Sequence, residues 1–478
     1  MTEPSNDLGL LAPIWADTLV AEQTGDAAYL QAMLDAEFAL SRALAAAGLA
    51  PDWVTAAVDD LAERARPDLP AIVAEARGGG NPVIPLTRYL YAAAEDVRPG
   101  LADHIHRGAT SQDIMDTATM LVARRAGGAI MAAAHTLATR LAELADRHRA
   151  TVLAGRTLGQ QAAPTSFGFK AAGWLDGVLV AARALDDVLR DLPVQLGGAV
   201  GTGAALYDAA ERSASAGPDA GAERERPADV VNRVLDAYAA ELGLRRPMIS
   251  WHTQRGVIAD LGHALAGLTG SIGKIAADVS VLSRTEIAEV HLELPAGSGG
   301  SSAMPHKRNP VPAVLLLAAA RQAAAPVATL HASLVAEEER PSGAWHAEWS
   351  PLRELLRLAG AATETGADLA GRLRVDADQM RRNLEATGGA IMSERLVGAL
   401  TAQAGRKRAQ QITADVLGAD RAPGLRVKLL DHPDVALTDG QIDDLLDPAR
   451  YLGMADEFID AVLRDHASRT TSDEDGSS

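Results

Sequence analysis

The stretch MDTATMLVARRAGGAIMAAAHTLATRLAELADRH, residues 115–148, decides the fold class of this chain. Its apolar side chains recur four, three, four and three residues apart, at Ile130, Ala134, Leu137, Leu141 and Leu144. This spacing places one apolar stripe along an α-helix and is typical of a helix that packs in a bundle. The stretch therefore predicts a long helix with other helices against it.

Similar segments occur on both sides of this stretch, at residues 29–47, 167–192, 230–242, 253–292 and 312–337. Aromatic residues are few (Phe 4, Tyr 6, Trp 6) and Ala is abundant, so the core must close with small aliphatic side chains that let helices approach closely. We expect an all-α, three-domain fold. Its parts are a helical N-terminal domain, a central long-helix bundle, and a C-terminal domain of small helices with a disordered tail, at residues 1–105, 106–350 and 351–478.

Other segments break the helical pattern. GGGNPVIP at 78–85 is expected to be irregular, because it holds three glycines and two prolines. Residues 208–229 are rich in Ser, Ala, Gly, Glu and Arg and predict a surface excursion, and the charge run 337–340 predicts a solvated helix end. Charge or proline interrupts every apolar stretch before about 18 residues, so we expect no membrane-spanning helix.

The charge balance limits the partners of the chain. Its 478 residues carry a formal net charge of −18 without a long basic run, which argues against a nucleic-acid partner because phosphate binding needs clustered Lys and Arg. With no cysteine, disulfides and thiolate metal ligands are excluded, and no basic-then-apolar signal precedes the first predicted helix. These features favour a cytoplasmic enzyme.

Three polar loops interrupt the helical sequence and carry the candidate chemistry. They are HRGATSQD, GRTLGQQAAPT and GSGGSSAMPHKRNP, at residues 106–113, 155–165 and 297–310. Each loop adjoins a long predicted helix and can therefore lie at an end of the bundle. We expect the three loops to converge at one site.

The loop 297–310 is the most informative of the three. Its glycines suit a mobile lid, and a serine base at Ser301 or Ser302 would need its alkoxide stabilised by backbone amides and by cationic Lys307. Lys307 and Asn309 can hold a carboxylate, whose negative charge grows when a proton α to it is removed. Taken alone, GSGGSS also fits a flexible linker, whereas MPHKRNP does not.

The segment SSAMPHKRNP at 301–310 resembles the signature of the fumarase/aspartase superfamily, which includes adenylosuccinate lyase, argininosuccinate lyase and 3-carboxy-cis,cis-muconate cycloisomerase. TSQD at 110–113 and GRT at 155–157 are similar to its first and second signature regions, in the expected order. The resemblance covers roughly residues 10–465. Four further segments look most like the cycloisomerase branch: GGNPVIP at 79–85, HRGATSQDIMDTA at 106–118, WHTQR at 251–255 and GAWHAEW at 343–349.

The resemblance implies a three-domain fumarase/aspartase-like fold and a homotetramer whose active sites are each assembled from loops of three subunits. It also implies that Ser301 is the general base, which takes a proton from Cβ of a small polycarboxylate, and that Lys307 and Asn309 bind a carboxylate. Further substrate contacts are implied for Thr110, Ser111, Gln112, Thr157, Gln254 and Ser302. No metal or organic cofactor is implied.

One position departs from the better-known relatives. Leu158 follows GRT where fumarases and adenylosuccinate lyases have a histidine with an acid or charge-relay role, and leucine cannot donate a proton. Asn81 and Trp349 stand where adenylosuccinate lyases tend to have a histidine and a substrate-binding arginine. A leaving group that needs protonation is therefore a poor fit.

Two reactions of the superfamily are compatible with Leu158 at this position. The first, favoured by the branch resemblance, is cycloisomerisation of 3-carboxy-cis,cis-muconate, in which a substrate carboxylate attacks the alkene. The second is elimination from a substituted succinate whose leaving group is a stable anion, such as nitrite from nitrosuccinate, to give fumarate. Adenylosuccinate lyase activity and a catalytically silent homologue rank behind them, and the intact set of Ser301, Lys307 and Asn309 speaks against silence.

Several polar residues have two interpretations. Thr110 and Ser111 can cap a helix or contact substrate, and both can hold because a helix N-terminus attracts anions. Arg156 can bind a substrate carboxylate or be structural. His106 and Asn81 are further candidate site residues, although the sequence near His106 lacks a third metal ligand at a suitable spacing.

Overall fold

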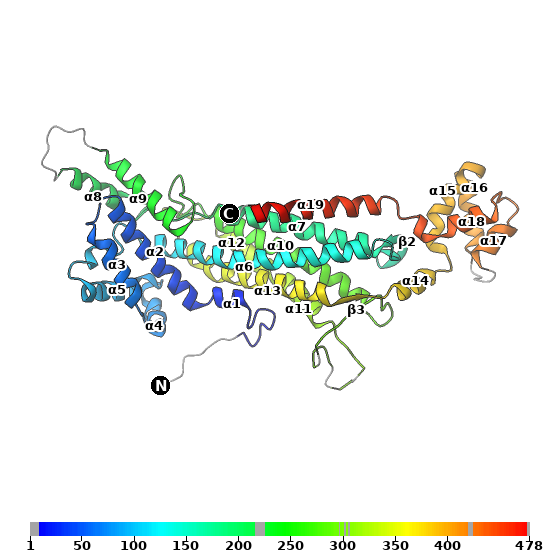
Figure 1. Ribbon diagram of the computed structural model, residues 1–478, viewed down its shortest axis with the longest axis horizontal. Coiled ribbons are helices and arrows are strands. Elements are labelled where there is room, and N and C mark those ends of the chain that lie inside the picture. The colour runs from blue at the N-terminus through cyan, green and yellow to red at the C-terminus, as the bar shows by residue number, and fades with distance from the viewer. Residues whose placement is uncertain are drawn as a thin grey trace. The chain divides into compact units, whose positions relative to one another are not determined.

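Helices make up most of the chain in a computed structural model, which describes residues 9–215, 225–295, 297–300, 303–304, 306–418 and 424–475 (Figure 1). The strands within these residues are short: β1 Val152–Thr157, β2 Gln160–Ser166, β3 Val290–Leu292 and β4 Leu373–Val375. β1 pairs with β2 and β3 pairs with β4, both antiparallel. The predicted all-α class is confirmed.

The chain folds into two compact units, each built from three separate segments. Unit 1 comprises Met1–Ala133, Ala181–Gly270 and Ala319–Ala362, and unit 2 comprises Ala134–Val180, Ser271–Ala318 and Thr363–Ser478. The predicted domain borders near residues 105 and 350 both fall inside unit 1. The three-domain division therefore stays a prediction.

Unit 1 contains a group of helices around the one predicted at 29–47, now α2. Its members are α1 Leu19–Gln23, α2 Asp26–Ala46, α3 Trp53–Arg64, α4 Leu69–Gly79, α5 Val83–Val97, the 3₁₀ helix η1 Ala102–His104, α8 Ala204–Ser215, α9 Pro227–Leu242 and α12 Ala324–Ala332. α2 packs against α3 and α9. The apolar side chains of α2 that share one face in the sequence are buried: Leu30, Met33, Leu34, Phe38 and Leu44.

Five helices contain the borders between the segments of the two units: α6 Ser111–Arg147, α7 Phe167–Arg190, α10 Gly256–Leu282, α11 Val311–Gln322 and α13 Ala344–Arg372. α6 confirms the helix predicted at 115–148. Within unit 1, a Cβ atom on Gly127 of α6 would collide with Leu189 of α7, and one on Gly262 of α10 would collide with Leu330 of α12. Such close approaches require small residues in the helix interfaces.

Unit 2 ends in a series of shorter helices, as the glycines and prolines beyond residue 350 predict. The elements are α14 Ala377–Glu385, η2 Ala390–Met392, α15 Ser393–Ala404, α16 Arg406–Val416, α17 Leu425–Asp431, α18 Asp439–Leu446, η3 Pro448–Arg450 and the longer α19 Ala455–Asp475. Leu396, Leu429 and Ile442 of α15, α17 and α18 are fully buried in one apolar cluster. Figure 1 shows α15 to α18 gathered together.

Two segments that the sequence predicts to be irregular are partly helical. In 78–85 only residues 80–82 form a turn, because α4 continues through Gly79 and α5 begins at Val83. Pro85 fits in the first turn of α5, where its missing N–H would have no partner within the helix. In 208–229, α8 extends through Ser215 and buries two alanines, and residues 216–224 lie outside the described residues.

Other predicted boundaries also need correction. The helix expected at 253–292 ends at Leu282, and the one expected at 312–337 is divided into α11 and α12 and ends at Ala332. The charge run 337–340 therefore lies in a loop and not at a helix end. The tail predicted to be disordered is helical as far as Asp475. The loop predicted at 155–165 is instead a hairpin of β1 and β2.

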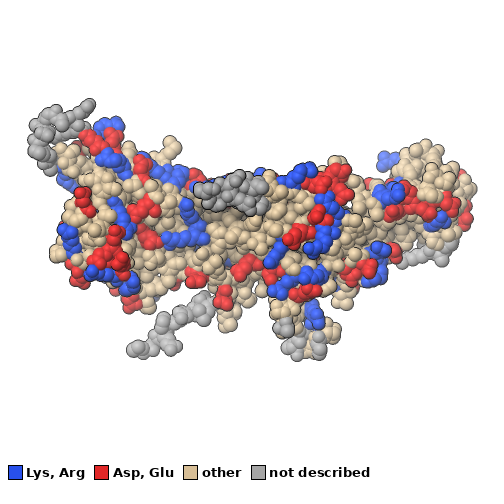
Figure 2. Space-filling view, in the orientation of Figure 1, with Lys and Arg blue, Asp and Glu red and all other residues tan. Residues whose placement is uncertain are grey.

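Two helical stretches, Gly256–Leu282 and Val311–Ala332, are long and apolar enough by length and composition to cross a membrane. The expectation that every apolar stretch is too short is therefore wrong. Within the structure, 50% of the apolar window in the first stretch and 28% of that in the second are buried. Core helices of soluble proteins meet the same criteria of length and composition. On the face shown in Figure 2, acidic and basic side chains are interspersed.

Candidate active site

Asp113, in the first turn of α6, holds three segments of unit 1 together. Its carboxylate accepts hydrogen bonds from the backbone N–H groups of Thr110, Gly197 and Gly198 at 2.9, 2.8 and 2.9 Å. A fourth contact joins it to Nε2 of His252 at 2.7 Å. Asp113 is 0% exposed, so these four groups replace the water that its charge has lost.

Arg340, in the loop before α13, holds the side chains of Thr110 and Gln112. Its guanidinium donates to Oγ1 of Thr110 at 3.2 Å, to Oε1 of Gln112 at 3.0 Å and to the carbonyl of Ala199 at 3.2 Å. Gln112 in turn donates to the carbonyl of His252 at 2.8 Å. Because the Thr110 oxygen accepts from Arg340, its own proton is available for another acceptor.

Thr110 and Ser111 lie at the N-terminus of α6, as the capping interpretation predicts. The Asp113 carboxylate accepts a hydrogen bond from the Thr110 N–H, as the side chain of the third helical residue does in a capping box. Thr110 and Ser111 are half-buried, whereas Gln254 is exposed. A helix N-terminus with a free hydroxyl proton suits an anion, so capping and substrate contact remain compatible.

One turn further along α6, Asp116 belongs to a buried ion-pair network centred on Arg255. Arg255 lies 2.7 Å from Asp116 and 2.7 Å from Glu348, and Nε1 of Trp345 donates to Asp116 at 3.0 Å. Burial alone would lower the pKa of Arg255, but Asp116 and Glu348 raise it above its ordinary value. The network fixes α13 against α6 and so fixes the loop that carries Arg340.

His106, at the start of the first polar loop, pairs with Glu37 of α2. His106 Nδ1 and Glu37 Oε1 are 2.7 Å apart, and Glu37 is 0% exposed. Burial lowers the pKa of His106, but the charge of Glu37, with a smaller contribution from Asp113, raises it above 6.5. Within the described ranges, no group of three or more His, Asp and Glu side chains is placed to hold a metal ion.

We expect Glu37→Gln to flatten the pH dependence of stability above about pH 6.5. In the unchanged protein, the protonated His106 pairs with Glu37, so its contribution is complete below the ordinary His pKa of 6.5 and is lost as pH rises through the raised pKa. Glutamine keeps the shape of the side chain but removes the charge. Melting temperatures between about pH 5 and pH 9 test this, and parallel declines in the two proteins would contradict it.

Asn81 lies in the turn between α4 and α5. Its Oδ1 accepts from the N–H of Val83 at 3.0 Å, and its Nδ2 donates to the carbonyl of Gly79 at 3.4 Å. A Cβ atom on Gly80 would lie 3.7 Å from Nε2 of His346. Asn81 therefore shapes the turn beside the His346 ring, and its contact with substrate stays a prediction.

In unit 2, the GRT motif ends strand β1, and a tight turn follows it. Leu158 and Gly159 form the turn, with φ of +51° and +80°, and Thr157 pairs with Gln160 across it. Such two-residue turns favour Asn or Gly at both positions. The Leu158 side chain is fully exposed at 103%. The residue that stands where relatives have a histidine is therefore displayed at the tip of a hairpin.

Arg156 forms a paired contact with the buried carboxylate of Glu289. The two Arg156–Glu289 bonds measure 2.6 and 2.9 Å, and Asn383 of α14 donates to the same carboxylate at 2.8 Å. Glu289 is 0% exposed, so the planar guanidinium neutralises a charge that water cannot reach. This contact fits the structural interpretation of Arg156, which then positions the adjacent Thr157.

Part of the loop 297–310 lies outside the described residues, including Ser301 and Ser302. Lys307 is exposed and Asn309 is half-buried. Among the residues that the structure describes, neither of these two side chains has a hydrogen bond or an ion pair. Both can therefore bind a ligand without breaking a side-chain bond to any described residue.

The two ends of this loop are joined by the backbone. Gly300 forms an antiparallel bridge with Arg308, and the N–H of Asn309 donates to the carbonyl of Gly299 at 2.8 Å. Gly299 has a φ of +71°, and a Cβ atom there would collide with the Asn309 carbonyl. Glycine is therefore required at this position to bring the glycine-rich arm against the Lys-Arg-Asn arm.

Comparison with known proteins gives matches over nearly the whole chain. A family model described as lyase matches residues 14–325, and one described as adenylosuccinate lyase C-terminus matches residues 389–462. Nitrosuccinate lyase from Streptomyces davaonensis is 46% identical over 463 residues, 96% of this chain and 94% of that protein. 3-Carboxy-cis,cis-muconate cycloisomerase from Pseudomonas aeruginosa is 38% identical over 449 residues, 92% of this chain and 93% of that protein.

Solved structures agree with the sequence matches. The 3-carboxy-cis,cis-muconate lactonizing enzyme from Pseudomonas putida has a TM-score of 0.85 at 34% identity, and the match covers 97% of this chain and 100% of that one. The chain belongs to the fumarase/aspartase superfamily. It is an enzyme of the lyase or cycloisomerase type, as its motifs predict. Members of the superfamily act on small polycarboxylates and are typically oligomeric.

Within this superfamily enzyme, Arg340 is a residue that the sequence motifs do not indicate. The prediction of a solvated helix end is wrong for it, because Arg340 is half-buried and donates to Thr110 and Gln112. The sequence held one faint signal, a cation directly after three consecutive glutamates and before Pro341. The three glutamates indicate a solvent-exposed segment, but they do not determine the direction of the Arg340 side chain. Arg340 is a positioning residue for the first signature loop.

We expect Arg340→Gln to lower kcat/KM by about 10–100-fold, the loss that corresponds to one or two charged hydrogen bonds. Without the guanidinium, Thr110 and Gln112 can rotate away from the positions that they hold in the first signature loop. Lysine keeps the charge but not the planar guanidinium with its paired donors. The kcat/KM of Arg340→Lys should therefore lie between those of the unchanged protein and Arg340→Gln. Arg88→Gln, which removes an exposed pair with Glu75 in the same unit, serves as the control. Unchanged kinetics in Arg340→Gln would contradict the positioning role.

Proposed function

We propose that this enzyme eliminates nitrite from nitrosuccinate and releases fumarate. The observation that carries the proposal is the 46% identity to nitrosuccinate lyase over 96% of the chain, compared with 38% to the cycloisomerase of Pseudomonas aeruginosa. The sequence motifs alone favour cycloisomerisation. The higher identity moves the proposal to the second of the two reactions.

In the proposed reaction, Ser301 takes the proton from the carbon next to the nitro-bearing carbon. The electron pair of the broken C–H bond forms the new double bond, and the C–N bond pair leaves with nitrite. Negative charge grows on the carboxylate beside the reacting carbon, where Lys307 and Asn309 are proposed to bind. Fixed donors at that carboxylate lower the barrier because the charge is larger in the transition state than in the substrate.

The residue at the hairpin tip supports a leaving group that needs no proton. Leu158 cannot act as an acid, whereas nitrite is a stable anion and departs without protonation. Ammonia and hydroxide, by contrast, leave readily only when they are protonated. The position of Leu158 therefore supports nitrite over an amine or hydroxide as the group released.

The other carboxylate of the substrate is proposed to bind at the N-terminus of α6. Thr110 has a free hydroxyl proton, and the helix N-terminus offers N–H groups and a partial positive charge. Ser111 and Gln254 are proposed to complete this half of the site, with Thr157 and Ser302 as further contacts. Gln112 is fully buried and bonded at both ends of its amide, so its proposed role is to hold this half in position. Asp113, through its bonds to Thr110 and His252, holds this half in shape.

We further propose that the enzyme is a homotetramer with active sites shared by three subunits. The fully exposed Leu158 at the hairpin tip supports this arrangement, since a neighbouring subunit that covered it would remove its apolar surface from water. A neighbouring subunit would cover it. Mass measurement in solution tests the proposal, and a monomer with full activity would contradict it.

The function is tested by incubating the purified enzyme with nitrosuccinate and measuring fumarate and nitrite separately. We expect both products in equal amounts. The second candidate, cycloisomerisation, is favoured by the TM-score of 0.85 to the Pseudomonas putida lactonizing enzyme. A parallel incubation with 3-carboxy-cis,cis-muconate therefore follows the loss of muconate absorbance. Turnover of the muconate without release of nitrite from nitrosuccinate would overturn the proposal in favour of the second candidate.

A further inference from the structure

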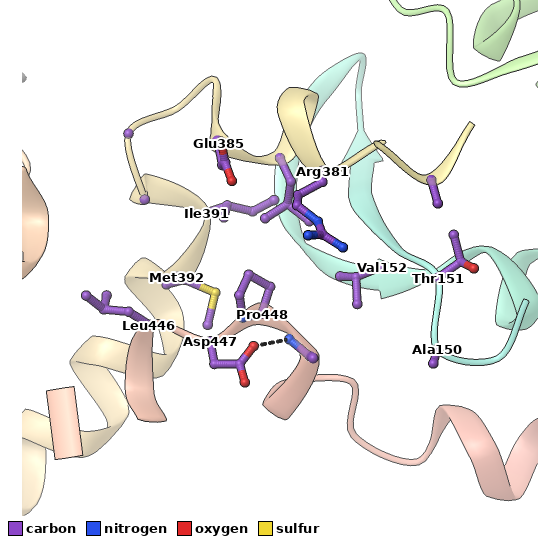
Figure 3. Close-up of a pocket in the computed structure, with 15 residues that line it drawn as sticks. Ala150, Thr151, Val152, Arg381, Glu385, Ile391, Met392, Leu446, Asp447 and Pro448 are labelled. Carbon is purple, nitrogen blue, oxygen red and sulfur yellow. Dashed lines mark hydrogen bonds between the residues drawn. The ribbon is translucent and has the colours of Figure 1, made fainter. Parts of the chain in front are cut away.

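Unit 2 contains a cavity of ≈ 700 Å³ that none of the predicted substrate contacts lines. Its walls come from Thr151 and Val152, from one side of α14, from the turn at residues 388–392 and from the segment that joins α18 to η3 (Figure 3). Sites for small molecules typically measure about 300–1,000 Å³ and combine an apolar surface with a few polar groups. The volume of this cavity lies within that range.

The floor of the cavity is apolar and well packed. Leu384, Ile391 and Met392 line it, and they are 5%, 3% and 1% exposed in one core cluster. Val152 and Leu446 pack against the same cluster and also line the cavity. A floor of this kind is fixed before a ligand arrives, so an apolar group placed on it loses water without disturbing the fold.

Two opposite charges stand at the rim of the cavity without partners among the described residues. Arg381 and Glu385 are exposed, and in the part of the chain that the structure describes neither side chain has a hydrogen bond or an ion pair. In Figure 3 both extend from α14 beside Ile391. They are one helical turn apart, but an acid that follows its base by four residues is in the weaker order for pairing along a helix.

Two charged residues nearby, Arg382 and Asp447, differ from Arg381 and Glu385 because their side chains form hydrogen bonds. Arg382, the next residue on α14, donates twice to Oε1 of Gln379 at 3.0 and 2.8 Å. Asp447, which also lines the cavity, accepts from the N–H of Ala449 at 3.0 Å. As far as the described residues show, Arg381 and Glu385 therefore leave one donor group and one acceptor group free above an apolar floor.

We propose that this cavity binds a zwitterionic α-amino acid with a large apolar side chain. Its carboxylate would bind the Arg381 guanidinium, its ammonium group would bind Glu385, and its side chain would lie on Leu384, Ile391 and Met392. The two charged groups of an α-amino acid are attached to one carbon, which suits two side chains one helical turn apart. A ligand with only one of these charges would face the unpaired like charge of the rim.

The test uses the full-length protein and L-tryptophan as the probe, with binding measured by titration calorimetry. Two analogues isolate the charges, since tryptamine lacks the carboxylate and indole-3-propanoate lacks the ammonium group. We expect L-tryptophan to bind at one site per chain and each analogue to bind at least about tenfold more weakly. Absence of heat at millimolar L-tryptophan, or equal affinity for the analogues, would overturn the proposal.

Matched variants locate the binding. Arg381→Gln and Glu385→Gln should each weaken L-tryptophan binding by at least about tenfold, while Arg382→Gln on the neighbouring face should leave it unchanged. All three side chains are exposed, so melting temperatures should stay the same and a loss of fold would not imitate a loss of binding. Equal weakening in all three variants, or none in the first two, would place the probe elsewhere and refute the assignment.

Discussion

Ser301→Ala is expected to lower kcat for the true substrate by about 10²–10⁴-fold, the range that a general base contributes. Alanine removes only the hydroxyl oxygen and its proton. Lys307 and Asn309, whose side chains are proposed to hold the carboxylate, stay in place, so KM should change little. Steady-state kinetics with nitrosuccinate, and separately with 3-carboxy-cis,cis-muconate, measure both constants.

Ser302→Ala is the matched control for this prediction, since it makes the same change one residue along the same loop. We expect it to cost less than about tenfold in kcat, as the loss of one neutral hydrogen bond would. A greater loss in Ser302→Ala than in Ser301→Ala would assign the base to the second serine. Unchanged turnover in both variants would contradict a serine base altogether.

The long helices could be predicted from the sequence because their apolar spacing is a local property. All the residues of the stripe that defines α6 are buried: Ile130, Ala134, Leu137, Leu141 and Leu144. The face of the helix on which each of these residues lies follows from its spacing of three or four residues to the next, and this spacing can be read from the sequence. The same holds for the apolar face of α2.

The β1–β2 hairpin could not be predicted in this way. The usual signal is a two-residue turn of Asn, Asp or Gly, because both turn residues have positive φ. Here Leu158 occupies the first turn position at +51°. A bulky residue in the left-handed region costs free energy that the flanking strands must offset. The segment consequently resembles a loop in the sequence.

The sequence motifs indicate candidate site residues, which stay a prediction, but they do not indicate the contacts between those residues. Motif resemblance pointed to Thr110 and Gln112, yet Arg340, which bonds to both, is 228 residues beyond Gln112 in the chain. The partner of Asp113, His252, is 139 residues away. Hydrogen bonds between residues so far apart in the sequence depend on how the helices pack. The local spacing of residue types does not show this packing.

Arg255→Met is expected to destabilise the protein by about 3–5 kcal/mol, the cost of removing one partner from a buried ion pair. Methionine roughly fills the space but leaves the carboxylates of Asp116 and Glu348 buried beside each other without their cation. Burial already raises the pKa of Glu348, and Arg255 opposes that rise. In the variant Glu348 should bind a proton more readily, so the loss of stability should shrink as the pH falls.

Arg42→Met is the matched control, because Arg42 also bridges two carboxylates, those of Asp59 and Glu241, each at 2.8 Å. Its side chain is 27% exposed, compared with 2% for Arg255. Solvent screens exposed pairs, so we expect a loss of at most about 1 kcal/mol. Urea unfolding at one fixed protein concentration measures both variants. Equal losses would contradict the importance of burial, and a pH-independent loss in Arg255→Met would exclude the two carboxylates as its source.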